Sequence, residues 1–158
     1  MKVYLDCCCY CRQFDDLTQE QVRAEVKAIV AIFKLHAQGS VSLVGSDVLT
    51  FEFGKISDCD KRMQILSDFS NVDEVIEISD SNRSRANQIQ ELSNIHACDA
   101  AHIACAEEAG ADVMLTTDYK LIKMASRLDL EVEVMNPRDC FEQFLNGGDF
   151  NGTSENEL

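Results

Sequence analysis

Basic residues are scarce in this sequence. Its 158 residues include 14 Lys and Arg against 28 Asp and Glu, so the net charge at pH 7 is −14. This deficit argues against an extended basic surface of the kind that displaces counterions from nucleic-acid phosphates. Any contact with nucleic acid would depend on a local group of basic side chains or on bound divalent cations. On charge alone, the simpler interpretation is that the acidic surface keeps the protein soluble.

Long apolar runs are also absent. No segment approaches the length of a membrane span, and the N-terminal residues MKVYLDCCCYC contain no apolar core of the signal-peptide kind. We therefore expect a cytoplasmic protein without a membrane segment. In that compartment the eight cysteines are expected to be reduced thiols that serve as small hydrophobic residues, rather than disulfides.

Proline occurs once, at Pro137, and this bears on a possible redox function. Cys8 and Cys11 form a C-x-x-C sequence between the first predicted strand and the first helix, where a thioredoxin-like motif would lie. Such a fold also needs a cis-proline at the start of a later strand, whereas Pro137 follows the last predicted strand and indicates a helix start. A thiol redox protein is therefore a minor alternative. Zinc binding is likewise not expected, since no second Cys/His pair has finger spacing.

Short β-like runs alternate with longer helical stretches along the chain. Strands are expected at residues 3–5, 41–44, 75–78 and 113–116, with a weaker fifth at 131–134. This alternation predicts right-handed crossovers and a mostly parallel sheet of four or five strands covered on both faces, a three-layer α/β/α fold. Residues 1–146 form this single domain. Residues 147–158 lack apolar periodicity and are expected to be a flexible acidic tail.

Several helix boundaries carry local signals. Thr18 and Gln21 predict a capping box at the start of the first long helix. Gly39 predicts a left-handed cap at its end, and Gly110 ends a later helix. Two further features are expected: a final helix starting at Asn136 and Pro137, and a helix whose apolar residues are Met63, Leu66 and Phe69.

Four acidic residues fall where an open parallel sheet binds ligands, beyond the carboxyl ends of its strands. Asp6 and Asp118 each follow a predicted strand and precede a loop that enters a helix. Asp99 lies in the first turn of the helix predicted at 97–109, and Glu52 stands between two phenylalanines. Each acid taken alone is more simply explained as a helix cap or a surface charge.

If these carboxylates converge, they need compensating charge. Two carboxylates about 5 Å apart repel by roughly 3 kcal/mol at an effective dielectric constant of about 20. Oxygen ligands select hard cations, so Mg²⁺ or Mn²⁺ is the expected cofactor. A metal held there would polarise a phosphodiester and activate a water molecule for hydrolysis, without a side-chain nucleophile.

The segments that carry these acids resemble the successive motifs of the PIN-domain family, in that family's order and spacing. They are VYLD (3–6), SDVLTFE (46–52), DAAHIACA (99–106) and LTTD (115–118), and the similarity spans residues 2 to about 145. The resemblance implies a PIN-like three-layer fold and metal-dependent endoribonuclease activity, as in VapC-type toxins, which are held by a small antitoxin. It also implies catalytic and metal-binding roles for four acids, with two supporting threonines: Asp6, Glu52, Asp99 and Asp118, then Thr116 and Thr117.

Other residues near these motifs are expected to contact an RNA substrate: Arg12, Lys55, His102 and Lys120. The simpler interpretation of Arg12 is a solvated side chain, and that of His102 is a packed, hydrogen-bonded histidine. Cys7 and Lys120 differ from residues common in the family, which leaves a catalytically weak PIN-fold interaction module as the main alternative. The partners implied by the resemblance are RNA, an antitoxin protein and a second copy of the chain in a homodimer.

Overall fold

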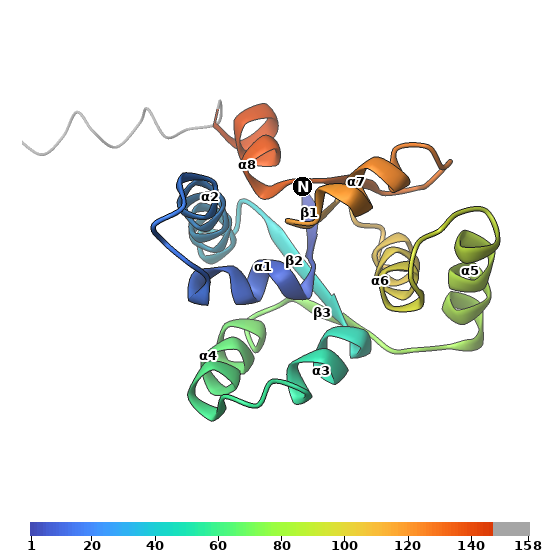
Figure 1. Ribbon diagram of the computed structural model, residues 1–158, viewed down its shortest axis with the longest axis horizontal. Coiled ribbons are helices and arrows are strands. Elements are labelled where there is room, and N and C mark those ends of the chain that lie inside the picture. The colour runs from blue at the N-terminus through green and yellow to red at the C-terminus, as the bar shows by residue number, and fades with distance from the viewer. Residues whose placement is uncertain (147–158) are drawn as a thin grey trace, which may run out of the picture.

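Five parallel strands form one sheet at the centre of the molecule (Figure 1). The structure is a computed structural model and describes residues 1–146, so the predicted acidic tail lies outside the described residues. The strand order is β3-β2-β1-β4-β5. The strands are β1 (Lys2–Leu5), β2 (Ser42–Ser46), β3 (Glu74–Ile76), β4 (Val113–Leu115) and β5 (Glu133–Met135). The predicted parallel sheet is confirmed, with all five expected strands present.

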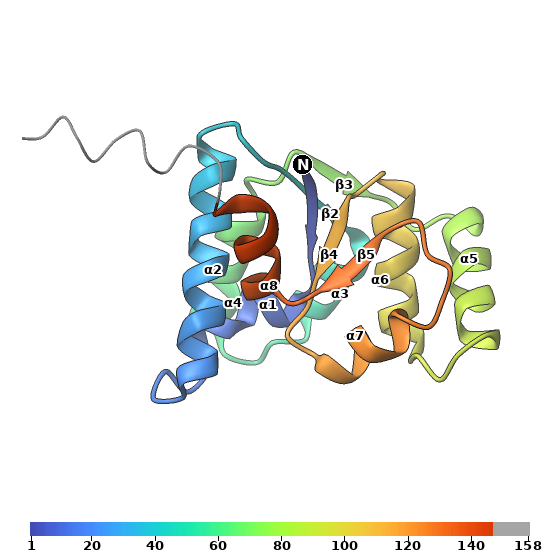
Figure 2. The same cartoon turned by 90° about the horizontal axis from the view of Figure 1, so that it is seen from above.

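Helices cover both faces of this sheet, which explains why the strands are almost continuously apolar. Figure 2 shows α2, α4 and α8 on one side of the strands, and α6 on the other side with α5 packed outside it. The helices are α1 (Cys7–Cys11), α2 (Glu20–Ala37), α3 (Asp47–Gly54), α4 (Cys59–Phe69), α5 (Asp80–Glu91), α6 (Ala97–Glu108), α7 (Tyr119–Ala125) and α8 (Pro137–Cys140). A 3₁₀ turn follows α1 at Arg12–Phe14, and α8 continues as a π-helical turn at Phe141–Leu145. The predicted three-layer α/β/α fold is therefore confirmed. Within residues 1–146, no helix is both long and apolar enough to cross a membrane.

Most of the predicted helix boundaries agree with the structure. Gly39 and Gly110 have positive φ angles of 78° and 67°, as left-handed caps require. The Asn136 side chain accepts a hydrogen bond from the Arg138 N–H, with Pro137 at the first helical position. The capping box at Thr18 is wrong, because α2 begins at Glu20 and the Thr18 hydroxyl instead donates to Asp16 at 2.6 Å.

Helix α1 starts directly after Asp6, where a loop was predicted. The Asp6 carboxylate caps this helix by accepting the Cys7 N–H at 2.7 Å. Asp118 likewise caps α7 without an intervening loop. Five residues are too few to show a helical apolar period, so the sequence contained no periodic signal for α1. Both acids are consequently held more rigidly than a loop would hold them.

An aromatic cluster fills the core between the sheet and helices α1, α3 and α4. The ring of Phe69 packs edge-on against Phe53 at 5.3 Å and Tyr10 at 5.8 Å between centroids. Of the three apolar residues predicted for this helix, only Phe69 is buried, while Met63 and Leu66 are 67% and 40% exposed. The core of this region therefore depends on few, large side chains.

Replacing Gly45 with alanine is expected to lower the free energy of unfolding by about 1–3 kcal/mol. A Cβ atom at this β2 position would lie 2.3 Å from Cε2 of Phe69, whose ring is held by its aromatic neighbours. Urea unfolding would measure the loss. The control is Gly54→Ala in α3, where an added Cβ meets no atom within 4 Å and alanine favours the helix. Equal effects of the two substitutions would contradict the steric argument.

Candidate active site

The predicted acids gather at the carboxyl edge of the sheet, beside the point where the strand order reverses. Strand β1 pairs with both β2 and β4, and its register places Leu5 opposite Leu115. The residues that follow these two strands are therefore neighbours: the Asp6 N–H donates to the Leu115 carbonyl at 2.9 Å. Such a switch point is where open α/β sheets bind ligands.

Asp6 is held in place by four donors. One carboxylate oxygen, Oδ1, accepts the Cys7 N–H, while Oδ2 accepts the Thr116 hydroxyl at 3.0 Å and the Cys8 thiol at 3.4 Å. His102 Nε2 approaches Oδ1 at 3.5 Å. The Asp6 side chain is only 9% exposed, so these contacts replace most of its water. Cys7 contributes its backbone N–H to Asp6, and the neighbouring Cys8 contributes a side-chain contact.

Thr116 connects the two acids at the strand ends. Its hydroxyl donates to Asp6 and accepts the Asp118 N–H at 3.2 Å. Asp118 Oδ1 in turn accepts the N–H groups of Lys120 at 3.0 Å and Leu121 at 3.2 Å, because it caps α7. Thr117 contributes through its backbone, which donates to Cys8 Sγ at 3.3 Å.

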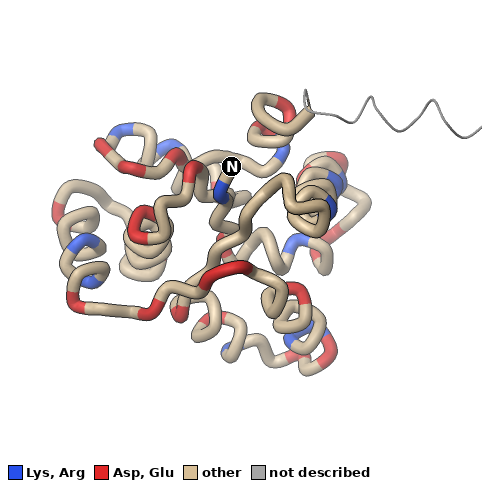
Figure 3. The backbone as a smooth tube through the Cα atoms, turned by 180° about the vertical axis from the view of Figure 1, so that it is seen from behind, with Lys and Arg blue, Asp and Glu red and all other residues tan. Residues whose placement is uncertain are grey.

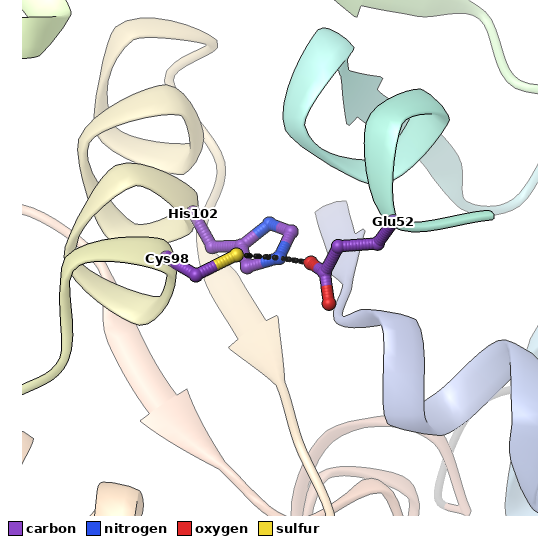
Figure 4. Close-up of side chains that lie close together, drawn as sticks. All are labelled: Glu52, Cys98 and His102. Atoms are coloured by element: carbon purple, nitrogen blue, oxygen red, sulfur yellow. Dashed lines mark hydrogen bonds and ion pairs between the residues drawn. The ribbon is translucent and has the colours of Figure 1, made fainter. Parts of the chain in front are cut away.

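Glu52 reaches the same edge from α3 and contacts His102 on α6. Its Oε1 is in direct hydrogen-bonding contact with His102 Nε2, as Figure 4 shows. Burial acts to lower the pKa of His102, but Cys98, Glu52 and Asp6 together raise it to about 10. Burial acts to raise the pKa of Glu52, and the His102 partner outweighs it and holds the pKa below its ordinary value. The metal-free site thus contains an imidazolium–carboxylate pair at neutral pH.

A buried hydrogen-bond chain through Tyr4 and Ser46 orients the His102 ring at its Nδ1 atom. The Tyr4 hydroxyl lies 2.6 Å from His102 Nδ1 and 2.6 Å from the Ser46 hydroxyl, and all three side chains are buried. Burial raises the pKa of Tyr4 well above its ordinary value, so its hydroxyl stays neutral. The prediction of a packed, hydrogen-bonded histidine agrees with this geometry.

Asp99 shows that the four acids share one electrostatic environment. Burial raises the pKa of this carboxyl, and the negative charges of Asp6, Asp118 and Glu52 raise it further. The acids are nevertheless spread out: within residues 1–146, no three of them have oxygen atoms that all lie within 4.8 Å of one another. They therefore interact through their charges without forming a tight group of ligand atoms.

Three residues at this edge were missed by the sequence-based prediction: Tyr4, Cys8 and Cys98. Cys98 had a usable signal, because it stands four residues before His102 in a predicted helix, so the two side chains share a face. Tyr4 and Cys8 carried no such signal. Their roles depend on which elements the fold brings against them.

The four predicted substrate-binding residues have different surroundings. Arg12 is paired with Asp15 at 3.0 Å and with the buried Glu25 at 2.9 Å, so a phosphate would have to compete with both. Lys55 Nζ lies 4.2 Å from the centroid of the Phe51 ring, and Lys120 is exposed next to Asp118. His102 is buried. Basic positions elsewhere lie mainly along helices such as α2 and α5, while acidic positions are spread over the molecule (Figure 3).

The C-x-x-C sequence lacks the setting of a redox motif. Cys8 Sγ faces Asp6 and Thr116, at 3.4 and 3.3 Å, and Cys11 Sγ lies 4.0 Å from Cys7 Sγ. Pro137 starts α8, and no peptide bond is cis in the part of the chain that the structure describes. The cis-proline that thioredoxin-like chemistry needs is therefore missing from this region.

The free energy of unfolding of the metal-free protein is expected to fall as the pH rises from about 6.5 to about 10. The folded protein keeps a proton on His102, whose pKa is about 10, while the unfolded chain loses it above about 6.5. The slope from this residue approaches about 1.4 kcal/mol per pH unit. Urea unfolding in EDTA and a reductant would measure it, with His102→Gln as the comparison. Parallel pH profiles for the two proteins would rule out His102 as the source.

Comparison with known proteins supports the fold. No protein-family model matches this chain, and no curated protein matches it. A solved structure does: a chain of "VapBC2 from Rickettsia felis bound to a DNA fragment from their promoter" superposes with a TM-score of 0.55 at 15% identity, covering 86% of this chain and 98% of that chain. The molecule therefore has a PIN-like three-layer α/β/α fold.

Proposed function

We propose that this protein is a metal-dependent endoribonuclease whose Asp6, Glu52, Asp99 and Asp118 hold Mg²⁺ or Mn²⁺ and direct hydrolysis of RNA phosphodiesters. The proposal is supported by geometry at the carboxyl edge of the sheet, where the Thr116 hydroxyl joins Asp6 to the backbone of Asp118 and His102 joins Glu52 to Asp6. The charges of these acids also raise the pKa of Asp99, and such an excess of negative charge is relieved by a cation. The donors are carboxylate oxygens, which suit hard divalent ions.

The chain's own residues would prepare the site for that reaction. Bound Mg²⁺ or Mn²⁺ would supply Lewis acidity and an activated water molecule. Thr116 and the Cys7 N–H orient Asp6, since each binds a different carboxylate oxygen. The N–H groups at the start of α7 fix Asp118. His102, held by Tyr4, positions Glu52. These contacts fix the orientation of the Asp6, Asp118 and Glu52 carboxylates.

Phe51 and Lys55 form a suitable contact surface for single-stranded RNA. Phe51 is 63% exposed, directly precedes Glu52 in α3, and carries the ammonium of Lys55 over its ring. Exposed aromatic rings stack on bases without sequence preference, and a nearby cation attracts the phosphates. Lys120 would add a second positive charge beside Asp118. These local features offset the unfavourable net charge.

We also propose that a small antitoxin protein binds this chain. The support is the resemblance to VapC-type motifs together with the fold likeness to a chain of the VapBC2 complex. Homodimerisation, which the resemblance implies as well, remains a prediction without an assigned interface. A catalytically weak interaction module is the second candidate function, and it is favoured by the overall charge of −14.

Incubation of the purified protein with RNA pools tests the nuclease proposal. Cleavage is expected with Mn²⁺ or Mg²⁺ and not with EDTA, and Asp6→Asn should remove it. The matched control is Asp129→Asn, which deletes the same charge from an exposed residue between α7 and β5. Equal cleavage by the wild type and Asp6→Asn, or none by either across several RNA pools, would reject the catalytic proposal.

A melting-temperature titration with Mn²⁺ separates the two candidate functions. An ion that binds only the native state raises the melting temperature. A rise without RNA cleavage would favour an interaction module that retains its metal site, whereas a rise together with cleavage favours the nuclease.

A further inference from the structure

A group of mixed ligands lies beside the carboxylates and has a different chemistry from them. Glu52, Cys98 and His102 present one oxygen, one sulfur and one nitrogen atom, all within 4.8 Å of one another (Figure 4). Cys98 and His102 are one turn apart on α6, with Sγ 4.0 Å from Nε2, and Glu52 comes from α3. We propose that these three side chains bind a thiophilic divalent transition-metal ion of the Zn²⁺ class.

The spacing suits a tetrahedral ion. Bond lengths of about 2.3 Å for Zn–S and about 2.0 Å for Zn–N place the two ligand atoms about 3.5 Å apart. The observed 4.0 Å between Cys98 Sγ and His102 Nε2 needs only a small inward rotation of the cysteine. Glu52 and His102 are in direct contact in the metal-free protein, so the carboxylate must move outward to admit an ion between them. It can do so because its side chain is 27% exposed.

The donor set distinguishes this site from the proposed nuclease site. Thiolate and imidazole ligands favour Zn²⁺ and similar ions, whereas Mg²⁺ takes oxygen ligands and avoids sulfur. Cys98 is exposed, which gives an ion a route from solvent, while His102 is 1% exposed and anchors the site. One position of a tetrahedron remains, for water or for Asp6, whose Oδ1 lies 3.5 Å from His102 Nε2.

An ion that binds Nε2 would displace the proton that His102 carries there, and the hydrogen bond behind the ring suits the neutral form that remains. When Nδ1 donates its proton to the Tyr4 hydroxyl, Nε2 is left with its lone pair directed at Glu52 and Cys98. The Tyr4 hydroxyl can then donate its own hydrogen bond to the Ser46 hydroxyl at 2.6 Å. Metal-binding histidines in proteins are usually fixed by such a partner on the second ring nitrogen.

Sharing of Glu52 gives the site a regulatory consequence. An ion bound by Glu52, Cys98 and His102 removes one carboxylate from the group proposed to hold Mg²⁺ or Mn²⁺. We therefore expect Zn²⁺ to inhibit Mn²⁺-dependent RNA cleavage, a consequence that rests on the proposed function. The binding site itself does not rest on it.

Titration of the full-length, reduced, metal-free protein with Co²⁺ tests the binding site without any activity assay. A thiolate-to-cobalt charge-transfer band should appear at one equivalent, and Zn²⁺ should displace it while excess Mg²⁺ should not. Cys98→Ser is expected to remove the band and to weaken Zn²⁺ binding at least about tenfold. Cys59→Ser, which changes another exposed cysteine, should leave both unchanged.

Several outcomes would overturn the proposal. They are a band that survives in Cys98→Ser, a band lost in Cys59→Ser, or no band at all. His102→Gln supplies an independent check, since it should weaken Co²⁺ binding while circular dichroism confirms folding. Failure of RNA cleavage would reject the proposed function and leave the cobalt result to decide the metal site. In a cleaving protein, Cys98→Ser should raise the Zn²⁺ concentration needed for inhibition at least about tenfold.

Discussion

Replacing Asp99 with asparagine is expected to change activity and stability in opposite directions. Mn²⁺-dependent RNA cleavage should fall at least about a hundredfold, because a carboxylate of the proposed metal site is lost. The free energy of unfolding of the metal-free protein should rise. Burial and three neighbouring acids raise the pKa of Asp99, so its ionised form is disfavoured in the folded state. At pH 7 this penalty is present, and a neutral amide removes it.

Urea unfolding in EDTA and a cleavage assay with Mn²⁺ would measure the two effects. Asp80→Asn is the matched control, because Asp80 also lies in the first turn of a helix and is exposed. It should lose a little stability, about 0.3–1 kcal/mol, through the helix dipole. A loss of stability in Asp99→Asn like that in Asp80→Asn would show that the neighbouring acids do not destabilise ionised Asp99. A cation would then not be needed to relieve repulsion among them.

Replacing Glu25 with alanine is expected to lower the free energy of unfolding by about 3–5 kcal/mol. Glu25 is 1% exposed, and its two oxygens accept hydrogen bonds from Arg12 Nη2 and Asn136 Nδ2, each at 2.9 Å. It therefore ties α2 to the turn after α1 and to the start of α8. Removal of the carboxylate leaves the buried Asn136 amide and the mostly buried Arg12 guanidinium without this partner, and their desolvation is not recovered.

Denaturant unfolding would measure this effect, with Glu20→Ala as the control in the same helix. Glu20 is exposed in the first turn of α2, so its loss should cost less than about 1 kcal/mol. Glu25→Gln should fall between the two, because an amide oxygen can still accept one of the hydrogen bonds. A Glu25→Ala protein as stable as Glu20→Ala would show that the buried ion pair contributes nothing. The same pair explains why Arg12 is less available to a phosphate than its position suggested.

The order of strands and helices could be predicted from the sequence, because it depends on local patterns. The apolar runs, the glycines at the ends of α2 and α6, and the Asn136–Pro137 helix start each act within a few residues. The same holds for the acids at the strand ends, since parallel strands bring their carboxyl ends to one edge. The local signal failed at Thr18, because the Thr18 hydroxyl donates a hydrogen bond to the neighbouring Asp16 side chain instead of capping α2.

Tertiary structure alone decided which side chains meet at that edge. Glu52 was assigned from a motif, but its contact with His102 requires α3 and α6 to approach across the end of the sheet. Cys98 acquires a metal-binding setting only through that approach, and Tyr4 holds His102 from 98 residues away in the chain. Contacts between residues so far apart in the chain produce no periodic pattern in the sequence. The sequence by itself thus determined the fold class and the acidic character of the edge. The pairing of charges there, and with it the choice between hard and thiophilic ions, depends on long-range packing.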